Sequence, residues 1–189
     1  AAIAPRLMKL EIDSTSLETG GTLDVSQNNN SYIRTTRIDA LGLKVYRSRR
    51  VLEQFANQEW AVIAPQLSNQ ETLEVFGVSG TMALYRYELL AKVAEEGQIF
   101  DESFGSCKED VDLAFRLQSA GYASYVALDA VAYHARASGG LNDAGSFDTA
   151  RNKMSQHAEI QALSYRNHWF VLFKNEFWQN VALDWPWMA

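Results

Sequence analysis

Carboxylate side chains gather in the middle of this 189-residue sequence, where Glu109, Asp110 and Asp112 stand together. Apolar residues follow them at helical spacing, which predicts a short amphipathic helix that ends near Gly121. We expect Asp110 at the N-cap, because the free N–H groups and the dipole of a helix start stabilise negative charge. A carboxylate held ionised in this way could act as a general base.

The carboxylates have two interpretations. In the first, they only cap the helix, and Arg116 pairs with Asp112 one helical turn away. In the second, Asp110 faces a cleft and removes a proton from a substrate. The cluster by itself does not decide between them, so the elements around it must be considered.

Composition narrows the function classes. The net charge is −6, the pI is near 5.1, and the basic run at 47–50 is the only one, which argues against nucleic acid as a partner. Cys107 is the only cysteine, so an internal disulfide and a cysteine zinc site are excluded. No run reaches the ~18 apolar residues of a membrane span. The sequence therefore predicts a soluble protein of a reducing compartment, the cytoplasm.

Strands and helices alternate along the chain, which predicts the α/β class. A polar stretch from 11 to 46 interrupts this order, and 47–60 is expected to be loop with at most one helical turn. Two glycines inside the expected strand at 74–86 indicate a bulge or the close approach of a ligand. Strands are expected at 1–10, 31–38, 43–46, 74–86 and 123–134, and helices at 87–93 and 149–180.

The order of these features resembles the C-terminal portion of a family 2 glycosyltransferase of the rhamnosyltransferase and galactofuranosyltransferase type. The resemblance covers roughly Val75 to Asn175 and implies a partial GT-A fold, a mixed sheet flanked by helices. It is carried, in order, by Gly77-Val78-Ser79-Gly80, Tyr85-Arg86, Phe100-Asp101-Glu102, Glu109-Asp110-Val111-Asp112-Leu113, Arg116, Gly121, His134, Arg166-Asn167 and Lys174-Asn175.

The resemblance implies a chemical role for three residues. Asp110 matches the base that deprotonates the acceptor hydroxyl, and Glu109 would flank the acceptor or orient Asp110. His134 matches a histidine that helps to hold a divalent cation, Mn or Mg, on the diphosphate of the donor. As an alternative, His134 is a strand-end histidine that makes one hydrogen bond.

The resemblance also implies substrate contacts. Gly77, Ser79 and Gly80 would let the main chain approach the sugar or acceptor, although a simple bulge explains the same residues. Arg166 could donate a fork of hydrogen bonds to the pyrophosphate. An arginine on the helix surface is the alternative interpretation.

One departure from the family pattern concerns the Asp-x-Asp motif, which in the family holds the metal. The only Asp-x-Asp sequence is Asp110-Val111-Asp112, at the helix start. We therefore expect residues 1–189 to be the C-terminal, acceptor-side part of a single catalytic domain. On this view the N-terminal nucleotide-binding half is absent and the chain is inactive alone, with 149–189 as an aromatic-rich helical segment.

The resemblance thus implies inverting transfer of a sugar from a nucleotide-diphospho-sugar to a saccharide or lipid-linked acceptor, in the synthesis of a cell-envelope polysaccharide. A non-catalytic carbohydrate-binding or interaction module that retains the half-fold is the alternative. A hydrolase is disfavoured, because no second carboxylate is placed across a cleft. The tryptophans at 168–187 favour peripheral contact with the inner face of the cell membrane, or packing on the missing half.

Overall fold

A mixed five-stranded sheet forms the centre of the protein. The computed structural model describes residues 1–12, 32–135 and 147–188. The strand order is β2-β1-β7-β5, and β6 pairs with the start of β1. Only the β1–β7 pair is parallel, so the predicted α/β class with a mixed sheet is confirmed. The strands of this sheet are β1 (Ala2–Ile12), β2 (Tyr32–Ala40), β5 (Thr72–Val75), β6 (Leu84–Tyr85) and β7 (Ser124–His134).

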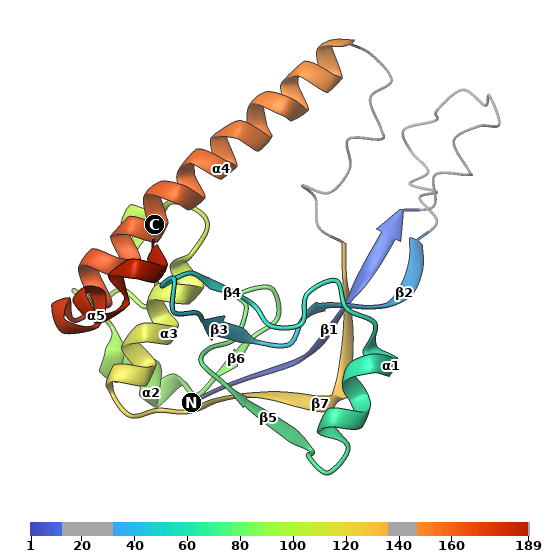
Figure 1. Ribbon diagram of the computed structural model, residues 1–189, viewed down its shortest axis with the longest axis horizontal. Coiled ribbons are helices and arrows are strands. Elements are labelled where there is room, and N and C mark those ends of the chain that lie inside the picture. The colour runs from blue at the N-terminus through green and yellow to red at the C-terminus, as the bar shows by residue number, and fades with distance from the viewer. Residues whose placement is uncertain (13–31, 136–146, 189) are drawn as a thin grey trace.

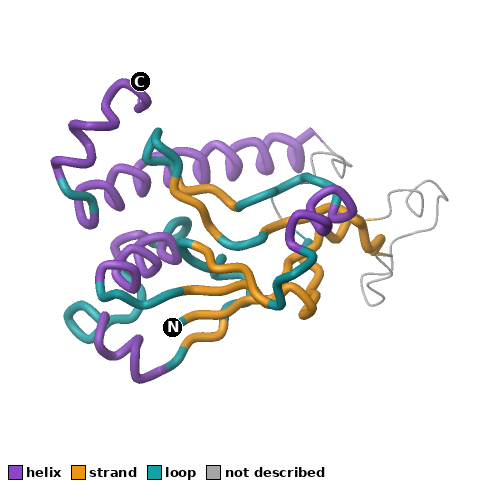
Figure 2. The backbone as a smooth tube through the Cα atoms, turned by 60° about the horizontal axis from the view of Figure 1, so that its bottom comes forward, coloured by secondary structure: helices purple, strands orange, loops and turns teal. Residues whose placement is uncertain are grey.

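A small hairpin and the helices complete the fold (Figure 1). The chain starts among the strands, and it ends on the helical side of the molecule (Figure 2). The hairpin consists of β3 (Leu43–Val45) and β4 (Val51–Glu53). The helices are α1 (Trp60–Ile63), α2 (Tyr87–Val93), α3 (Glu109–Ser119), α4 (Phe147–Asn175) and α5 (Trp178–Met188), with 3₁₀ turns at Ala64–Leu67 and Glu102–Phe104.

Helix α3 is buried on two opposite sides. Leu113 and Leu117 belong to the core that includes β1 and β7. Val111 and Phe115 belong to a second cluster, in which they meet the β3–β4 hairpin and Val171 of α4. A helix that is covered all round is held in one position. The start of α3, which carries the acidic cluster, is therefore fixed relative to both the sheet and α4.

The expected strand at 74–86 is wrong, because the structure divides it into β5 and β6. Residues 76–83 leave the sheet between them and turn toward α3 and the hairpin. Main-chain hydrogen bonds join Leu43 N to Gly77 O at 2.8 Å and Phe76 N to Leu43 O at 3.2 Å. A Cβ built on Gly77 would lie 2.3 Å from Cβ of Ala114 in α3. Glycine at this position thus permits close packing of the loop on the helix.

Two further expectations are corrected. The stretch 47–60 contains strand β4, which pairs with β3 as a short hairpin around the charged run at 47–50. The charged residues hide this strand because they favour a loop in the sequence. The single helix expected at 149–180 ends at Asn175, and α5 follows from Trp178. Arg49 holds α5 in place, because its guanidinium pairs with Glu176 at 2.9 Å and with Asp184 at 2.6 Å. The strand piece expected at 31–38 begins at Tyr32, and residues 13–31, which are most of the polar stretch before it, lie outside the described residues, as do 136–146.

Candidate functional site

Asp110 lies in the first turn of α3 and faces the loop at 76–83. The helix begins earlier than expected, with Lys108 as the N-cap in a left-handed conformation, φ 69°. Asp110 Oδ2 accepts a hydrogen bond from Gly80 N at 2.9 Å, and Oδ1 accepts one from Val111 N at 2.8 Å. These main-chain donors hold the carboxylate in one orientation.

The electrostatic environment of Asp110 suits a proton acceptor. Burial raises the pKa of Asp110, the Gly80 hydrogen bond opposes the rise, and the like charge of Glu109 adds to it. Burial, together with the charges of Asp110 and Glu109, also raises the pKa of the Tyr85 phenol, which therefore keeps its proton. Glu109 Oε2 is buried and receives no hydrogen bond from the described residues. Two carboxylates and a phenol thus lie within electrostatic reach of each other.

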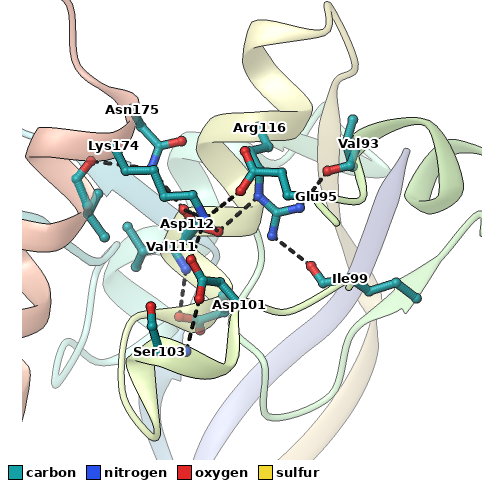
Figure 3. A network of polar contacts seen from close by, with 12 residues as sticks. Val93, Glu95, Ile99, Asp101, Ser103, Val111, Asp112, Arg116, Lys174 and Asn175 are labelled. Atoms are coloured by element: carbon teal, nitrogen blue, oxygen red, sulfur yellow. Dashed lines mark hydrogen bonds and ion pairs between the residues drawn. The ribbon is translucent and has the colours of Figure 1, made fainter. Parts of the chain in front are cut away.

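Asp112, only two residues further along, has the opposite environment. It is fully buried, and three side chains donate to its carboxylate (Figure 3). Arg116 Nε donates to Oδ2 at 2.9 Å, Lys174 Nζ to the same oxygen at 3.2 Å, and Asn175 Nδ2 to Oδ1 at 2.9 Å. The expected pairing of Arg116 with Asp112 is confirmed. The ion-pair part of the first interpretation therefore describes Asp112. Asp110, in contrast, has no cationic side chain as a hydrogen-bond partner among the contacts of the described residues.

The same network ties the preceding loop to α4 (Figure 3). Lys174 Nζ also lies 2.7 Å from Asp101 Oδ2, and this hydrogen bond lowers the pKa of Asp101 to about 2. Arg116 donates to the main-chain oxygens of Val93 and Ile99, each at 2.6 Å. The loop that leads to Glu109 and Asp110 is thereby held from both sides.

Asn167 and Arg166 bind this loop through its main chain. The Asn167 side chain is fully buried, and its Nδ2 donates to the carbonyl groups of Phe104, Ser106 and Cys107 at 2.7–2.9 Å. Arg166 Nη2 donates to the Phe104 carbonyl at 3.1 Å. The structure therefore shows a contact of Arg166 with the loop, and its binding of a pyrophosphate stays a prediction. Sequence patterns name Asn167 only as part of the resemblance, and its position inside a helix, where asparagine is disfavoured, is the signal that points to a partner for its side chain.

The small residues before β6 have different surroundings. Gly80 is exposed and bonded to Asp110, so the structure brings it to the carboxylate cluster. Ser79 is buried, and its Oγ lies 3.3 Å from Oγ1 of Thr81. Gly77 is buried against Ala114. Of the three, Gly80 is the one that contacts Asp110.

His134 ends β7 and pairs with a residue that sequence reasoning passed over. Its Nδ1 lies 2.9 Å from Oδ2 of Asp39, which is buried at the end of β2. The two strands flank β1, so residues 95 positions apart meet across it. Metal-binding histidines commonly direct one ring nitrogen to a carboxylate in this way. In the part of the chain that the structure describes, however, no three His, Cys, Asp or Glu side chains come together as a metal site.

Comparison with known proteins identifies one family. The family model described as Glycosyl transferase family group 2 matches residues 29–183. The comparisons with curated proteins and with solved structures found no match. Among the described helices, none is both long and apolar enough to cross a membrane.

Proposed function

Since that match spans well over half of its length, the chain belongs to glycosyl transferase family group 2, and we propose that it transfers a sugar with inversion from a nucleotide-diphospho-sugar to a saccharide or lipid-linked acceptor. Family membership supports glycosyl transfer in general, and the mixed α/β structure is consistent with a GT-A-like fold. The observation that carries the proposal is the fixed position of the Asp110 carboxylate at the start of α3. The main-chain N–H groups of Gly80 and Val111 donate to it and hold it there.

In the proposed reaction, Asp110 accepts the proton of the acceptor hydroxyl as its oxygen attacks the anomeric carbon of the donor. The new carbon–oxygen bond forms on the face opposite the leaving nucleoside diphosphate, which departs with the electrons of the bond that breaks. A base with a raised pKa is suited to this step, because proton acceptance is then more favourable near neutral pH. Glu109 contributes to the raised pKa of Asp110 and has a buried oxygen without a partner among the described residues, so it could accept from the acceptor sugar.

A divalent cation belongs to this proposal. His134 would supply an imidazole nitrogen, and Asp39 would hold its ring in the ligating orientation, as the 2.9 Å contact suggests. When bound, the cation would neutralise charge on the leaving diphosphate. The proposed site of the donor diphosphate is therefore the β2–β7 end of the sheet. One imidazole nitrogen is an incomplete ligand set, and phosphate oxygens of the donor would supply further ligands.

The decisive experiment is substitution of the base in the intact protein. Asp110→Asn should lower turnover by ~10²-fold or more and leave binding of the nucleotide sugar nearly unchanged, since the amide can still accept from Gly80 N but cannot take a proton. Release of nucleoside diphosphate measures turnover, and calorimetry measures binding. Glu71→Gln, an exposed carboxylate outside the site, is the matched control.

Two results would contradict the proposal. Near wild-type turnover in Asp110→Asn would remove Asp110 from the mechanism. Binding of oligosaccharides with no nucleotide-sugar turnover under any condition would favour the carbohydrate-binding module instead.

A further inference from the structure

A second feature adjoins the base and has no role in the reaction as described. It is a cavity of about 710 Å³ between the β3–β4 hairpin, the residues that precede α3, and helices α4 and α5. We call it the hairpin cavity. The lining residues that carry the argument are Arg50, Lys108, His168, Tyr165, Trp169 and Trp187.

The polar part of the hairpin cavity is basic. Arg50, Lys108 and His168 line it, and none of its described lining residues is an aspartate or a glutamate. Burial, and then the charges of Lys108 and Arg50, lower the pKa of His168, so the three groups are within electrostatic reach of each other. Gathering like charges is unfavourable unless a counter-charge is present, and the carboxylates that act on Lys108, Asp110 and Glu53, lie outside the lining. In a protein of net charge −6, such a carboxylate-free basic cavity is suited to an anionic ligand.

The remaining wall is aromatic. The rings of Tyr165 and Trp169 meet edge to face with centroids 6.4 Å apart, and Trp187 comes from α5. Pockets for small ligands are mostly lined by apolar and aromatic side chains, with a few polar groups that fix orientation. Aromatic faces beside cationic groups suit a ligand that combines a sugar ring with an anion.

One lining residue of the hairpin cavity, Lys108, lies within electrostatic reach of Asp110. Lys108 is the N-cap of α3, two residues before Asp110, and the charge of Asp110 acts on Lys108 together with that of Glu53. A group bound at Lys108 would therefore bind at a residue that interacts electrostatically with the carboxylate proposed to receive the proton. The residues that line the cavity include neither His134 nor Asp39, to which the donor diphosphate is assigned above.

We propose that the hairpin cavity binds the phosphate of a glycosyl phosphate or diphosphate acceptor, with Arg50, Lys108 and His168 around the phosphate and the acceptor sugar directed toward Asp110. This inference rests on the proposed function, because it names the acceptor of the same reaction. A lipid-linked sugar diphosphate and a soluble sugar phosphate share this chemistry. Arg50 and Lys108 would neutralise the anion, and His168 would add a hydrogen bond that helps to position the acceptor hydroxyl.

Binding without turnover tests the inference. The intact protein would be titrated by calorimetry with a glycosyl diphosphate that carries a methyl group, the same compound with a long isoprenoid chain in detergent, and the neutral methyl glycoside. We expect the diphosphates to bind at least about 10-fold more tightly than the glycoside, with an affinity that falls as salt rises. If only the diphosphate with the isoprenoid chain binds, the acceptor is lipid-linked. If the two diphosphates bind equally, the cavity recognises the phosphate and not the chain.

Charge-removing variants locate the binding. Arg50→Gln and Lys108→Gln should each weaken diphosphate binding by about 10-fold and leave glycoside binding unchanged, as expected for the loss of a charge-assisted hydrogen bond. Lys44→Gln removes an exposed charge from the same hairpin, outside the cavity, and should have no effect. Equal affinity of glycoside and diphosphate, or diphosphate binding unaffected by both variants, would overturn the inference. So would weakening of nucleotide-sugar binding in place of acceptor binding.

The two proposals fail separately. Asp110→Asn should still bind the diphosphate acceptor, because Asp110 does not line the hairpin cavity. Charge-dependent acceptor binding together with full turnover in Asp110→Asn would support the acceptor site in the hairpin cavity and would show that Asp110 is not the base. Loss of turnover in Asp110→Asn, together with equal binding of diphosphate and glycoside, would support Asp110 as the base and would overturn the proposed role of the hairpin cavity.

Discussion

Asp110 and Asp112 show how strongly the surroundings of a single carboxylate determine what it can do. Asp112 is fully buried and accepts from Arg116, Lys174 and Asn175, so its charge is compensated within the fold. Asp110 accepts only main-chain hydrogen bonds among the contacts of the described residues, and burial raises its pKa. Two identical side chains in one helical turn thus have environments suited to different tasks, Asp112 to stability and Asp110 to the proton transfer proposed for it.

The raised pKa of Asp110 has a consequence for stability. A carboxyl whose pKa is higher in the folded state than in the unfolded chain favours folding at low pH, and this contribution is lost as pH rises through the folded-state pKa. We therefore expect Asp110→Asn to have a higher Tm than the wild type at pH 8, with a gain that shrinks toward pH 4. Thermal melting over this range measures it. A gain that stays constant with pH would show that ionisation is not its cause.

The contact between His134 and Asp39 leads to a prediction about metal binding. His134→Ala should weaken Mn²⁺ binding to the intact protein by about 10-fold or more, and Asp39→Asn by a similar factor, because one supplies and the other orients the ligand. Calorimetry measures the affinity. His168→Ala, whose ring lies in the hairpin cavity, serves as the control. Unchanged Mn²⁺ affinity in His134→Ala would show that His134 is not a metal ligand and only makes its hydrogen bond to Asp39.

Among the elements, α3 owes its position to polar contacts as well as to its two apolar sides. The loop before it is anchored by Asn167 of α4, and its first turn is anchored by Lys174 and Asn175 at the end of α4. Every one of these contacts joins residues more than 60 positions apart. Helix α4 therefore acts as a support for the loop and helix start that carry Glu109 and Asp110.

Removal of the acceptor at the centre of this network should be costly. Asp112→Ala would leave Arg116 and Lys174 without their buried partner, and breaking a buried ion pair in this way typically costs about 3–5 kcal/mol. Denaturant unfolding measures the change. Arg37→Ala breaks the exposed pair with Glu59 and should cost at most about 1 kcal/mol. Similar losses in both variants would contradict a special role for Asp112.

Over the molecule as a whole, exposed aromatic side chains are concentrated on α4 and α5. Their rings form a continuous series in which Tyr165 contacts Trp169, Trp169 contacts Phe173, and Phe173 contacts Trp178. Trp185 is also exposed, at 66%. Tryptophan is enriched where an apolar ring meets the membrane–water interface. Peripheral membrane contact through this surface remains a prediction of the sequence.

Point substitutions test this contact better than truncation, because the last third of α4 supplies the buried Asn167 and Val171. Trp178 and Trp185 are seven residues apart and share one face of α5. The double variant Trp178→Ser, Trp185→Ser should reduce flotation of the intact protein with anionic vesicles by about tenfold or more, since each ring would lose its burial in lipid. Tyr87→Ser, equally exposed on α2, is the control. Equal flotation of all three proteins, or of none, would exclude the contact.

Local patterns in the sequence were sufficient for the elements that carry the acidic cluster. The helix at 109–119 and the long strands at 2–12 and 124–134 follow from apolar periodicity and turn residues that lie within a dozen consecutive positions. The order of the motifs also led to the family, which the match over 29–183 shows. Such signals are readable because each depends on neighbours along the chain.

Tertiary structure alone decided which of these residues share an environment. It separated Asp110 from Asp112, joined His134 to Asp39 across β1, divided the expected strand at 74–86, and enclosed the hairpin cavity. The partners in these contacts are 30 positions apart for Gly80 and Asp110, and 95 for Asp39 and His134. Burial and charge compensation depend on how distant segments pack, and they set the pKa and the reach of each group. A local pattern contains no record of that packing.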